Sequence, residues 1–430
     1  MRQMHLGLFL LGTGSHVAGW RMPGAVTSFQ DIAAIRAMAA QAERACFDLI
    51  FMGDNLYADP DAHPSYTLRL EPLTMLAALA MTTTHIGLGA TVSTTYSDPW
   101  SVARAFASLD HISGGRAAWN AVTTSSALAG ANFGRVHPNH AERYAVAGEF
   151  LDVVMGLWDG WADGALVADR ATGQYLDPAK LRVLNHNGPH FQVKGPLNIG
   201  RTPQGRPVIL QAGGSEPGLD LAARSADVVF SVVQDLGEAR AQYAALKSRL
   251  ARHGRRPEDV SVLPGVMPVV GRTEREALDK LAVLQGFINP QNARMLLAER
   301  LGVNLDAHEM DAPLNAVPLK EGSHGFTQSL LNKARRDNLT LRDVYNLLGA
   351  ARGHWVLCGS AEQVADTLQA WFEGGAADGF NVMPSHFPDG FEDFIELVVP
   401  ILQARGLFRT RYAGPMLRDQ LGLARPPSPF

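Results

Sequence analysis

The chain has 430 residues, of which 46% are hydrophobic and 19% are charged, and its formal net charge at pH 7 is −4. This composition is typical of a soluble globular protein with a large core, and the small net charge gives no support to binding of nucleic acid or of a membrane surface. An α/β barrel with insertions reaches this length as one unit, so we expect a single domain over residues 1–430.

The cysteines and the N-terminal segment indicate the compartment. Cys46 and Cys358 have no metal-ligand spacing, and a chain of this size requires no disulfide. The N-terminus runs into a short apolar strand without a secretory pattern, and no run of about 18 uncharged apolar residues predicts a membrane span. We therefore expect a cytoplasmic protein with no metal site and with neither nucleic acid nor membrane as partner.

Apolar segments of strand length alternate with longer amphipathic segments along the chain. Parallel strands with right-handed helical crossovers are expected, and eight such units favour a (β/α)8 TIM barrel over an open sheet. The expected strands are His5–Leu10, Asp48–Met52, Ile86–Thr91, Ala117–Thr123, Val208–Gln211, Val228–Val232, Val260–Val266 and Phe380–Met383. The expected helices are Ser28–Ala45, Glu71–Thr83, Ser101–Ile112, His140–Trp158, Pro217–Ala223, Gly237–Arg252, Glu274–Gln285 and Phe391–Gln403.

Two segments interrupt this alternation. Asp159–Arg206 is polar and rich in Gly, Pro and Asn, and Phe287–Cys358 contains helical patterns over Gln291–Leu301 and Thr327–Arg336. Long insertions on a barrel are commonly covers of a site or oligomer contacts, so we expect the second insertion to form a lid. After it, Trp355–Ser360 is expected to re-enter the barrel.

One half-cycle of the barrel is especially clear. The amphipathic helix Ser101–Ile112 ends at Gly114 and Gly115, and the following strand carries Asn120 and Thr123 at its polar end. Ligands of such barrels bind at the carboxyl ends of the strands, so these two side chains are site candidates by position.

Other strand ends are polar too. Asp54 follows the second strand, where a carboxylate either accepts from the N–H groups of a ligand or caps the next turn. The third strand ends in hydroxyls, with Thr91 and Ser93 on one side by alternation, although threonine is also a good strand former.

The fifth strand runs through Gly213 and Gly214 to Ser215 and then into a helix. Two glycines, a hydroxyl and the free N–H groups of a helix start suit a phosphate, but an ordinary N-cap serine gives the same pattern. His140 and Tyr144 lie four residues apart on one helix face, and they suit either a phosphate or a packed aromatic pair.

Two histidines are candidates for catalysis. His16 lies in a loop after the first strand, and His324 lies in the second insertion and could reach the site from a lid. The sequence contains no metal-ligand motif, no Gly-x-Ser-x-Gly elbow and no Gly-x-Gly-x-x-Gly after a strand, so a metalloenzyme, a hydrolase triad and a resident dinucleotide domain are unsupported.

Several long motifs, in order, resemble the family of nitrilotriacetate monooxygenase component A, whose FMN-dependent enzymes belong to the bacterial-luciferase-like group. These motifs are Phe9–Arg21, Ser101–Thr124, Gly374–Met383 and Arg405–Arg409. The resemblance implies flavin contacts at Asp54, Thr91, His140, Tyr144 and Ser215, with Asn120 lining the flavin ring. Family members often carry two adjacent histidines where this chain has Ser15-His16, so the role of His16 stays open between catalysis and structure.

The resemblance also implies an activity. The chain would be the oxygenase component of a two-component monooxygenase. It would take reduced FMN from a separate NAD(P)H-dependent flavin reductase and use O₂ as cosubstrate on a small organic molecule, either an organosulfur compound or an aminopolycarboxylate. Similar enzymes form dimers or tetramers, so a homo-oligomer is expected. Two alternatives are a deazaflavin (F420)-dependent oxidoreductase of the same barrel class and a non-catalytic flavin-binding relative.

Overall fold

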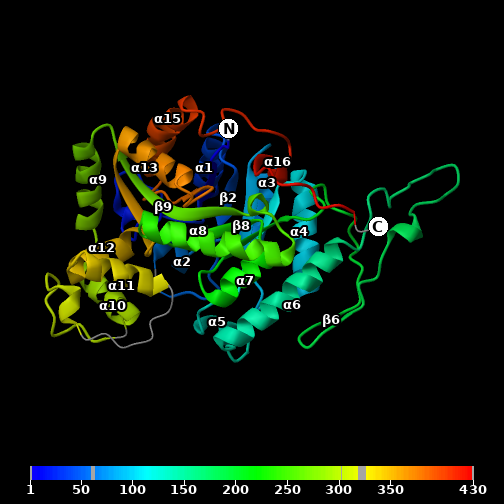
Figure 1. Cartoon of the computed structure of the whole chain (residues 1–430), viewed down its shortest axis with the longest axis horizontal. Coiled ribbons are helices and arrows are strands. Elements are labelled where there is room, and N and C mark those ends of the chain that lie inside the picture. Colours follow the sequence, from blue (N-terminus) through cyan, green and yellow to red (C-terminus); the bar gives the residue numbers. More distant parts are fainter. Residues whose placement is uncertain (1, 60–62, 302, 318–325, 429–430) are drawn as a thin grey trace.

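The computed structural model describes residues 2–59, 63–301, 303–317 and 326–428. Within these residues eight parallel strands close into a barrel, because β9 pairs with β8 on one side and with β11 on the other. The (β/α)8 prediction is therefore confirmed (Figure 1). The strands are β1 (His5–Phe9), β2 (Leu49–Met52), β3 (Gly87–Ser93), β4 (Ala117–Val122), β7 (Val208–Ala212), β8 (Val228–Ser231), β9 (Ser261–Gly271) and β11 (Gly379–Val382).

Helices surround this barrel. The main ones are α1 (Ile32–Arg44), α3 (Pro72–Ala80), α4 (Pro99–Ser113), α6 (His140–Trp158), α7 (Glu216–Ser225), α8 (Leu236–Leu250), α9 (Glu274–Gly286) and α13 (Ala361–Glu373). The expected C-terminal helix is divided into α14 (Asp389–Asp393), a π-helical turn (Phe394–Val398) and α15 (Val399–Ala404). Shorter helices are α2 (Pro64–Thr67), α5 (Leu128–Asn132) and α16 (Leu417–Gln420).

Alternation along the strands gives the barrel an outer and an inner core. On the outside, the buried ring of Trp119 in β4 packs against Phe106 of α4 and Phe150 of α6, with centroid distances of 5.9 and 5.7 Å. Inside, the rings of Phe9, Phe51 and Phe230 lie 5.0 to 5.8 Å apart. These three rings make an apolar floor beneath the carboxyl ends of the strands.

The turn between α4 and β4 is fixed by two buried charged side chains. Asp110 accepts from the backbone N–H of Ala117 at 3.1 Å and from the Gln204 amide at 2.6 Å. The Arg116 guanidinium instead donates to backbone carbonyls of Ala80, Thr83 and Ile86. Asp110 and Arg116 therefore hold this turn through separate partners.

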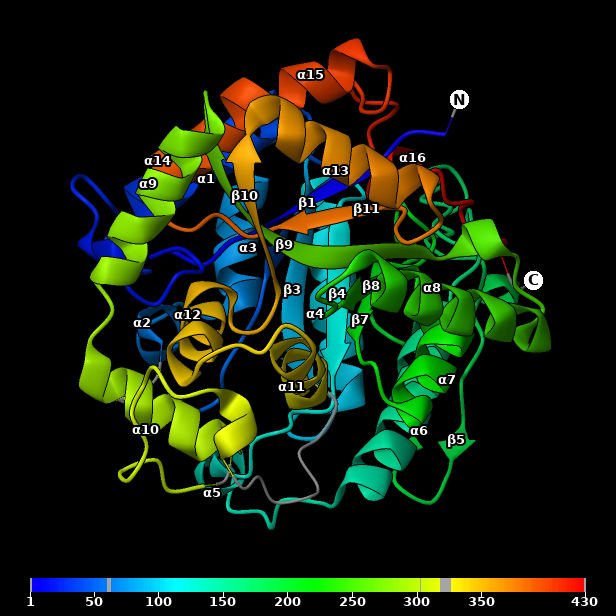
Figure 2. The same cartoon turned by 60° about the vertical axis from the view of Figure 1, so that its left-hand side comes forward.

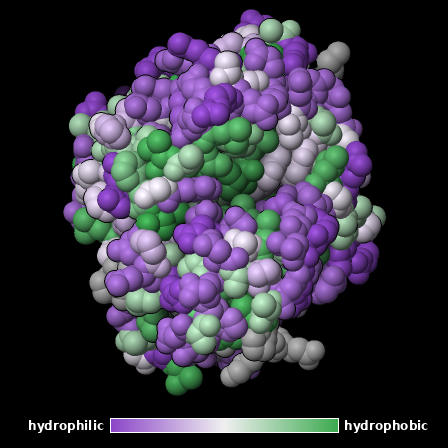
Figure 3. Space-filling view, turned by 90° about the vertical axis from the view of Figure 1, so that its left-hand side faces the viewer, coloured by the Kyte–Doolittle hydropathy of each residue, from purple (hydrophilic) through white to green (hydrophobic). Residues whose placement is uncertain are grey.

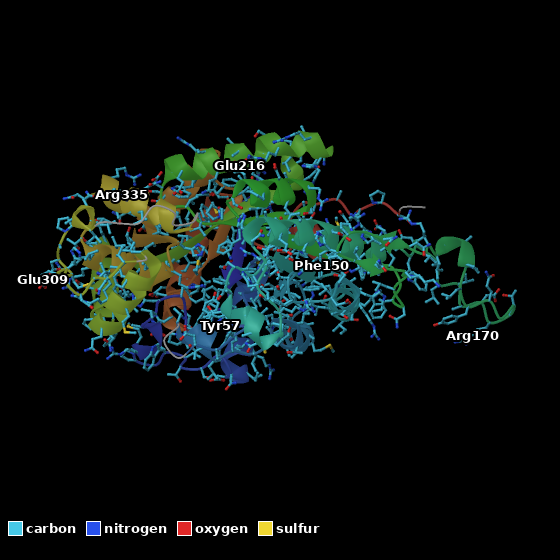
Figure 4. All side chains as sticks on the ribbon, turned by 90° about the horizontal axis from the view of Figure 1, so that it is seen from below. Tyr57, Phe150, Arg170, Glu216, Glu309 and Arg335 are labelled. Atoms are coloured by element: carbon cyan, nitrogen blue, oxygen red, sulfur yellow. The ribbon has the colours of Figure 1, made fainter. Side chains whose placement is uncertain are left out.

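The first insertion, residues 159–206, leaves the barrel as an extended arm, which carries a hairpin of β5 (His186–Asn187) and β6 (Gln192–Val193) (Figure 1). Figure 4 shows Arg170 at the far end of this arm, with Glu309 of the second insertion at the opposite end of the molecule. Near the body, Arg425 of the C-terminal segment pairs with Asp163 of the arm at 2.7 Å.

The second insertion has a small core of its own. Its helices are α10 (Pro290–Leu301), α11 (Phe326–Arg336) and α12 (Leu341–Ala351), which group together in Figure 2. The backbone N–H of Val17, in the loop after β1, donates to the carbonyl of Gly349 at 2.8 Å, and Arg336 pairs at 2.8 Å with Asp235 in the loop after β8. The insertion thus packs on loops at the carboxyl end of the barrel, where we expect a lid. His324 lies outside the described residues.

One strand differs from the prediction. β9 continues to Gly271 instead of ending at Val266, and β10 (Trp355–Ser360) pairs with this extension outside the closed ring of eight strands. Pro268 within the extension has no N–H to donate, but a strand with a neighbour on one side tolerates proline. On the face shown in Figure 3, hydrophobic residues gather in a central hollow within a mostly hydrophilic surface.

Two further findings bear on possible partners. None of the helices in the described ranges combines the length and apolar character that a membrane span requires. Across those same ranges, no three His, Cys, Asp or Glu side chains gather as ligands of a metal ion.

Candidate active site

The polar strand ends predicted from the sequence lie at one rim of the barrel. Because the eight strands are parallel, the residues that follow β2, β3, β4 and β7 all emerge at the carboxyl end. Asp54, Thr91, Asn120 and Ser215 come from these four strand ends. The parallel topology therefore brings them to a common rim, as the sequence-based argument requires.

Thr91 and Asn120 form a hydrogen-bonded pair inside this rim. They are register partners in β3 and β4, and the Asn120 Nδ2 amide donates to Thr91 Oγ1 at 2.8 Å. Both side chains are buried, and Asn120 Oδ1 has no hydrogen-bond partner among the described residues. A buried acceptor without a donor is costly, so this oxygen is suited to an N–H group of a ligand.

The position of Ser215 is compatible with both roles considered from the sequence, an N-cap and a phosphate contact. Its hydroxyl caps α7 by accepting from the backbone N–H of Gly218 at 3.3 Å, and it also lies 3.4 Å from the Tyr144 hydroxyl. The His140 and Tyr144 rings are 4.9 Å apart at the start of α6. The sequence elements expected to hold a phosphate thus meet where α6 and α7 begin.

Small residues keep space open in this cluster. A Cβ at Gly213 would lie 3.2 Å from the Tyr144 hydroxyl, and one at Gly218 would lie 3.0 Å from the same atom. A Cβ at Gly214 would meet nothing within 4 Å, so that glycine borders open space. The arrangement lets an anionic group approach the backbone and the hydroxyls of Ser215 and Tyr144.

Asp54 is paired with Arg69, a partner that the sequence pattern did not indicate. Arg69 Nε lies 3.5 Å from Asp54 Oδ1, and the same guanidinium donates to the Gly53 carbonyl. Burial raises the pKa of Asp54 to about 6, although the charge of Arg69 acts in the opposite direction. The Asp54 carboxylate is therefore held near its protonation midpoint at mildly acidic pH.

His16 is fully buried in the loop after β1. Its Nδ1 atom accepts from the backbone N–H of Ala18 at 3.1 Å, which places the ring proton on Nε2. Burial, assisted by the nearby His386, lowers the pKa of His16 to about 3, so the ring is neutral at physiological pH. Nε2 has no partner in the described part of the chain, so His16 offers an N–H donor and not an acid.

The structure adds residues that the sequence analysis missed. Asn381 in β11 is buried, and its Oδ1 atom has no hydrogen-bond partner in the described ranges. It occupies the same kind of position as Asn120, so alternation along the last strand could have identified it. Tyr66 and Arg352 could not be found this way, since they are 286 positions apart and meet only through the second insertion.

The comparisons with known proteins agree with this architecture. A family profile described as luciferase-like monooxygenase matches residues 4–378. The chain belongs to the luciferase-like monooxygenase family. It is 44% identical to N-acetyl-S-(2-succino)cysteine monooxygenase of Bacillus subtilis, over 99% of this chain and 98% of that protein.

Two further relatives extend the comparison. Nitrilotriacetate monooxygenase component A of Aminobacter aminovorans is also 44% identical, over 99% of this chain and 97% of the relative. A crystal structure of riboflavin lyase (RcaE) with modified FMN and riboflavin superposes with a TM-score of 0.85 at 32% identity, covering 98% and 96% of the two chains. The predicted family and monooxygenase activity of this luciferase-like protein are thereby confirmed.

Proposed function

We propose that this luciferase-like monooxygenase is the oxygenase component of a two-component system. It takes reduced FMN from a separate NAD(P)H-dependent flavin reductase and uses O₂ to oxygenate a small organic substrate. The observation that carries the proposal is the Oδ1 atom of Asn120, which has no hydrogen-bond partner among the residues described and shares the rim with the hydroxyl cluster of Ser215 and Tyr144. A flavin mononucleotide presents the complementary groups, a ring with an N–H donor and a phosphate.

The residues present fit this cofactor. Ser215, Tyr144 and His140 would hold the phosphate with the start of α7, while Thr91 and Asn120 would face the ring. Asp54 would accept from a ring N–H when it is ionised. Reduced FMN supplies the oxygen-activating chemistry, and the protein supplies orientation and exclusion of water.

The surrounding side chains have defined roles in this proposal. His16 offers its Nε2 proton as a neutral donor toward an oxygen atom of substrate or cofactor. The Phe9, Phe51 and Phe230 rings form an apolar floor that excludes water from below. The second insertion packs on the loops after β1 and β8, and we propose that it acts as a lid of a single-domain protein.

The substrate class follows from the relatives by analogy only. Nitrilotriacetate and N-acetyl-S-(2-succino)cysteine are the substrates in the names of two proteins that are each 44% identical to this chain. An aminopolycarboxylate or a carboxylate-bearing organosulfur compound is therefore the substrate class we propose. We further propose a cytoplasmic homo-oligomer, dimer or tetramer, that meets its reductase transiently.

A single mixing experiment tests the function. The protein is combined anaerobically with photoreduced FMN or with reduced F420 and a candidate substrate, and ¹⁸O₂ is then admitted. We expect ¹⁸O in the product when the cofactor is reduced FMN and no labelled product when it is reduced F420. Flavin reoxidation at the rate of free flavin, with no labelled product from any candidate, would contradict the proposal, and turnover with F420 would favour the alternative cofactor.

A further inference from the structure

Two arginine side chains pack against one tyrosine ring near Asp54. The guanidinium carbon of Arg352 lies 3.9 Å from the centroid of the Tyr66 ring, and that of Arg69 lies 4.8 Å from the same centroid. Arg352 also donates a hydrogen bond to the Tyr66 hydroxyl. Burial and, after it, the charge of Arg352 lower the pKa of Arg69. The two cations therefore repel each other, and an anionic group bound near both would relieve this repulsion.

Arg69 is buried but retains unused hydrogen-bond donors. Only 6% of its side-chain surface is exposed, and Nη2 donates to the Gly53 carbonyl. The Asp54 carboxylate lies 3.5 Å from Nε, which is too long for a strong charge-assisted bond. In the described residues Nε and Nη1 are both buried and make no hydrogen bond of good geometry, although the guanidinium lies close to the Tyr66 hydroxyl. A buried guanidinium with such weakly used donors favours binding of a further acceptor.

Apart from Asp54, which pairs with Arg69, the acidic and basic groups in the described residues around the two arginines do not offset their charge. His63 is buried, and its Nε2 atom donates to the carbonyl of Ser15 at 3.1 Å while Nδ1 accepts from the backbone N–H of Ser65. Burial and the charge of Arg352 lower the pKa of His63 to about 3, so its ring is neutral. Glu71 is occupied in capping α3 through the backbone N–H groups of Leu73 and Thr74. Asp54 is the remaining carboxylate beside the pair.

This cationic pair lies at the catalytic end of the barrel. Tyr66 reaches the rim, because a Cβ at Gly53, directly after β2, would lie 3.4 Å from the Tyr66 hydroxyl and 3.0 Å from the Phe9 ring. Arg352 ends α12 in a left-handed conformation, with φ of 55°, so the second insertion delivers its side chain to the same place. The lid and the barrel thus each contribute one cation.

We propose that Arg69 and Arg352 form a subsite for a carboxylate of the substrate. This inference rests on the proposed function, because only that function places a reacting centre beside the two arginines. Such a subsite would select anionic substrates over neutral ones. A guanidinium matches a carboxylate with two parallel N–H donors, which a lysine cannot do. A neutral sulfide or an alkane would leave the buried donors of Arg69 unsatisfied and would therefore bind poorly.

Calorimetric binding of succinate, and of its uncharged diamide as a probe of the same shape, tests the subsite without any turnover. Arg69→Gln and Arg352→Gln remove each cation, and Arg352→Lys keeps the charge without the fork. Arg275→Gln is the matched control, because that arginine is exposed on α9 and pairs with Asp279. Circular dichroism of each variant establishes whether it is folded. If Arg69→Gln is unfolded, succinate binding by Arg352→Gln alone tests the subsite.

We expect the wild-type protein and Arg275→Gln to bind succinate but not the diamide. Both glutamine variants should weaken succinate binding about tenfold or more. The affinity of Arg352→Lys for succinate should lie between that of the glutamine variants and that of wild type. Absence of succinate binding to the wild-type protein, or equal binding by Arg352→Gln, would overturn the subsite. Anaerobic titration with reduced FMN is measured in parallel, since its failure would count against the flavin proposal while leaving the anion result intact.

Discussion

The amide of Asn120 donates to the hydroxyl of Thr91 across the register between β4 and β3, at 2.8 Å, and the buried Oδ1 atom of Asn120 has no hydrogen-bond partner within the part of the chain that the structure describes. A core residue of ordinary packing function would not be arranged in this way, because an unsatisfied buried acceptor destabilises the folded state. The geometry makes sense if a ligand provides the missing donor.

Asn120→Ala tests this interpretation. We expect the affinity for reduced FMN to fall about tenfold, since one hydrogen bond to a buried acceptor is lost. The thermal midpoint should change little, because the variant also removes the unsatisfied oxygen. Anaerobic titration of reduced FMN and a melting curve provide the two measurements, and Ser108→Ala on the exposed side of α4 serves as the control. Unchanged affinity would remove Asn120 from the flavin site.

Ser215→Ala should affect both a helix and a ligand. Loss of the N-cap of α7 is expected to cost about 1 kcal/mol of stability, and loss of the hydroxyl should weaken binding of reduced FMN. Thr273→Ala removes the equivalent cap of α9, where the side chain accepts from the backbone N–H of Glu276 at 3.2 Å. It should destabilise the protein similarly and leave flavin affinity intact. Equal effects of the two variants on flavin affinity would show that Ser215 acts only as a cap.

Asp54 predicts a pH dependence of stability. Its folded-state pKa of about 6 lies above the ordinary value of 3.8, so the folded state binds the proton more tightly than the unfolded state does. The contribution of Asp54 to stability is therefore present below pH 4 and is lost as the pH rises through 6, by about 2–3 kcal/mol. Relative to wild type, Asp54→Asn should gain stability between pH 4.5 and 7.5.

Thermal midpoints at several pH values measure this difference. Asp311→Asn is a suitable control, because the neighbouring Arg342 lowers the pKa of that exposed carboxyl, and so its substitution should not stabilise the protein at higher pH. A stability difference between Asp54→Asn and wild type that stays constant with pH would mean that the pKa of Asp54 is ordinary.

Arg116→Met should destabilise the fold without touching the flavin site. The guanidinium satisfies carbonyls of Ala80, Thr83 and Ile86 in the buried turn before β3, and methionine would leave them unpaired. We expect a loss of about 3 kcal/mol or more in unfolding free energy, measured by urea denaturation. Arg104→Met, on the exposed side of α4, removes a guanidinium that lies over the Trp100 ring, and its effect should be small. A mild effect of Arg116→Met would show that other donors replace it.

Sequence reasoning went furthest where the signal was local. Seven of the eight barrel strands agree with their predicted bounds within two residues, because each is a short apolar run, and the helix His140–Trp158 matches its predicted bounds. The capping residues Ser360 and Gln363 define a helix start in the same local way, and the structure shows their reciprocal hydrogen bonds. The extension of β9 past Val266 is not visible in the sequence, because its stabilising neighbour, β10, lies 84 or more residues further along the chain.

The residues of the candidate site also differ in whether a local sequence pattern identifies them. Asn120 and Ser215 could be chosen because strand ends and helix starts are visible in one stretch of sequence. Arg69 and Arg352 could not, since their shared contact with Tyr66 depends on how the second insertion folds back over the rim. Tertiary contacts between distant segments leave no periodic pattern in either segment, so only coordinates bring such residues together.

The pairing of β10 with the C-terminal extension of β9 determines how this protein can be engineered. The chain departs through α9, which packs against β10, and it returns along β10 next to the strand it left. The entry and exit of the intervening module are therefore neighbours, so its length can vary without opening the hydrogen-bonded circle beneath. Transplanting this module between related enzymes, with both ends joined at β9 and β10, offers a route to exchanging preference for one compound over another on a constant frame.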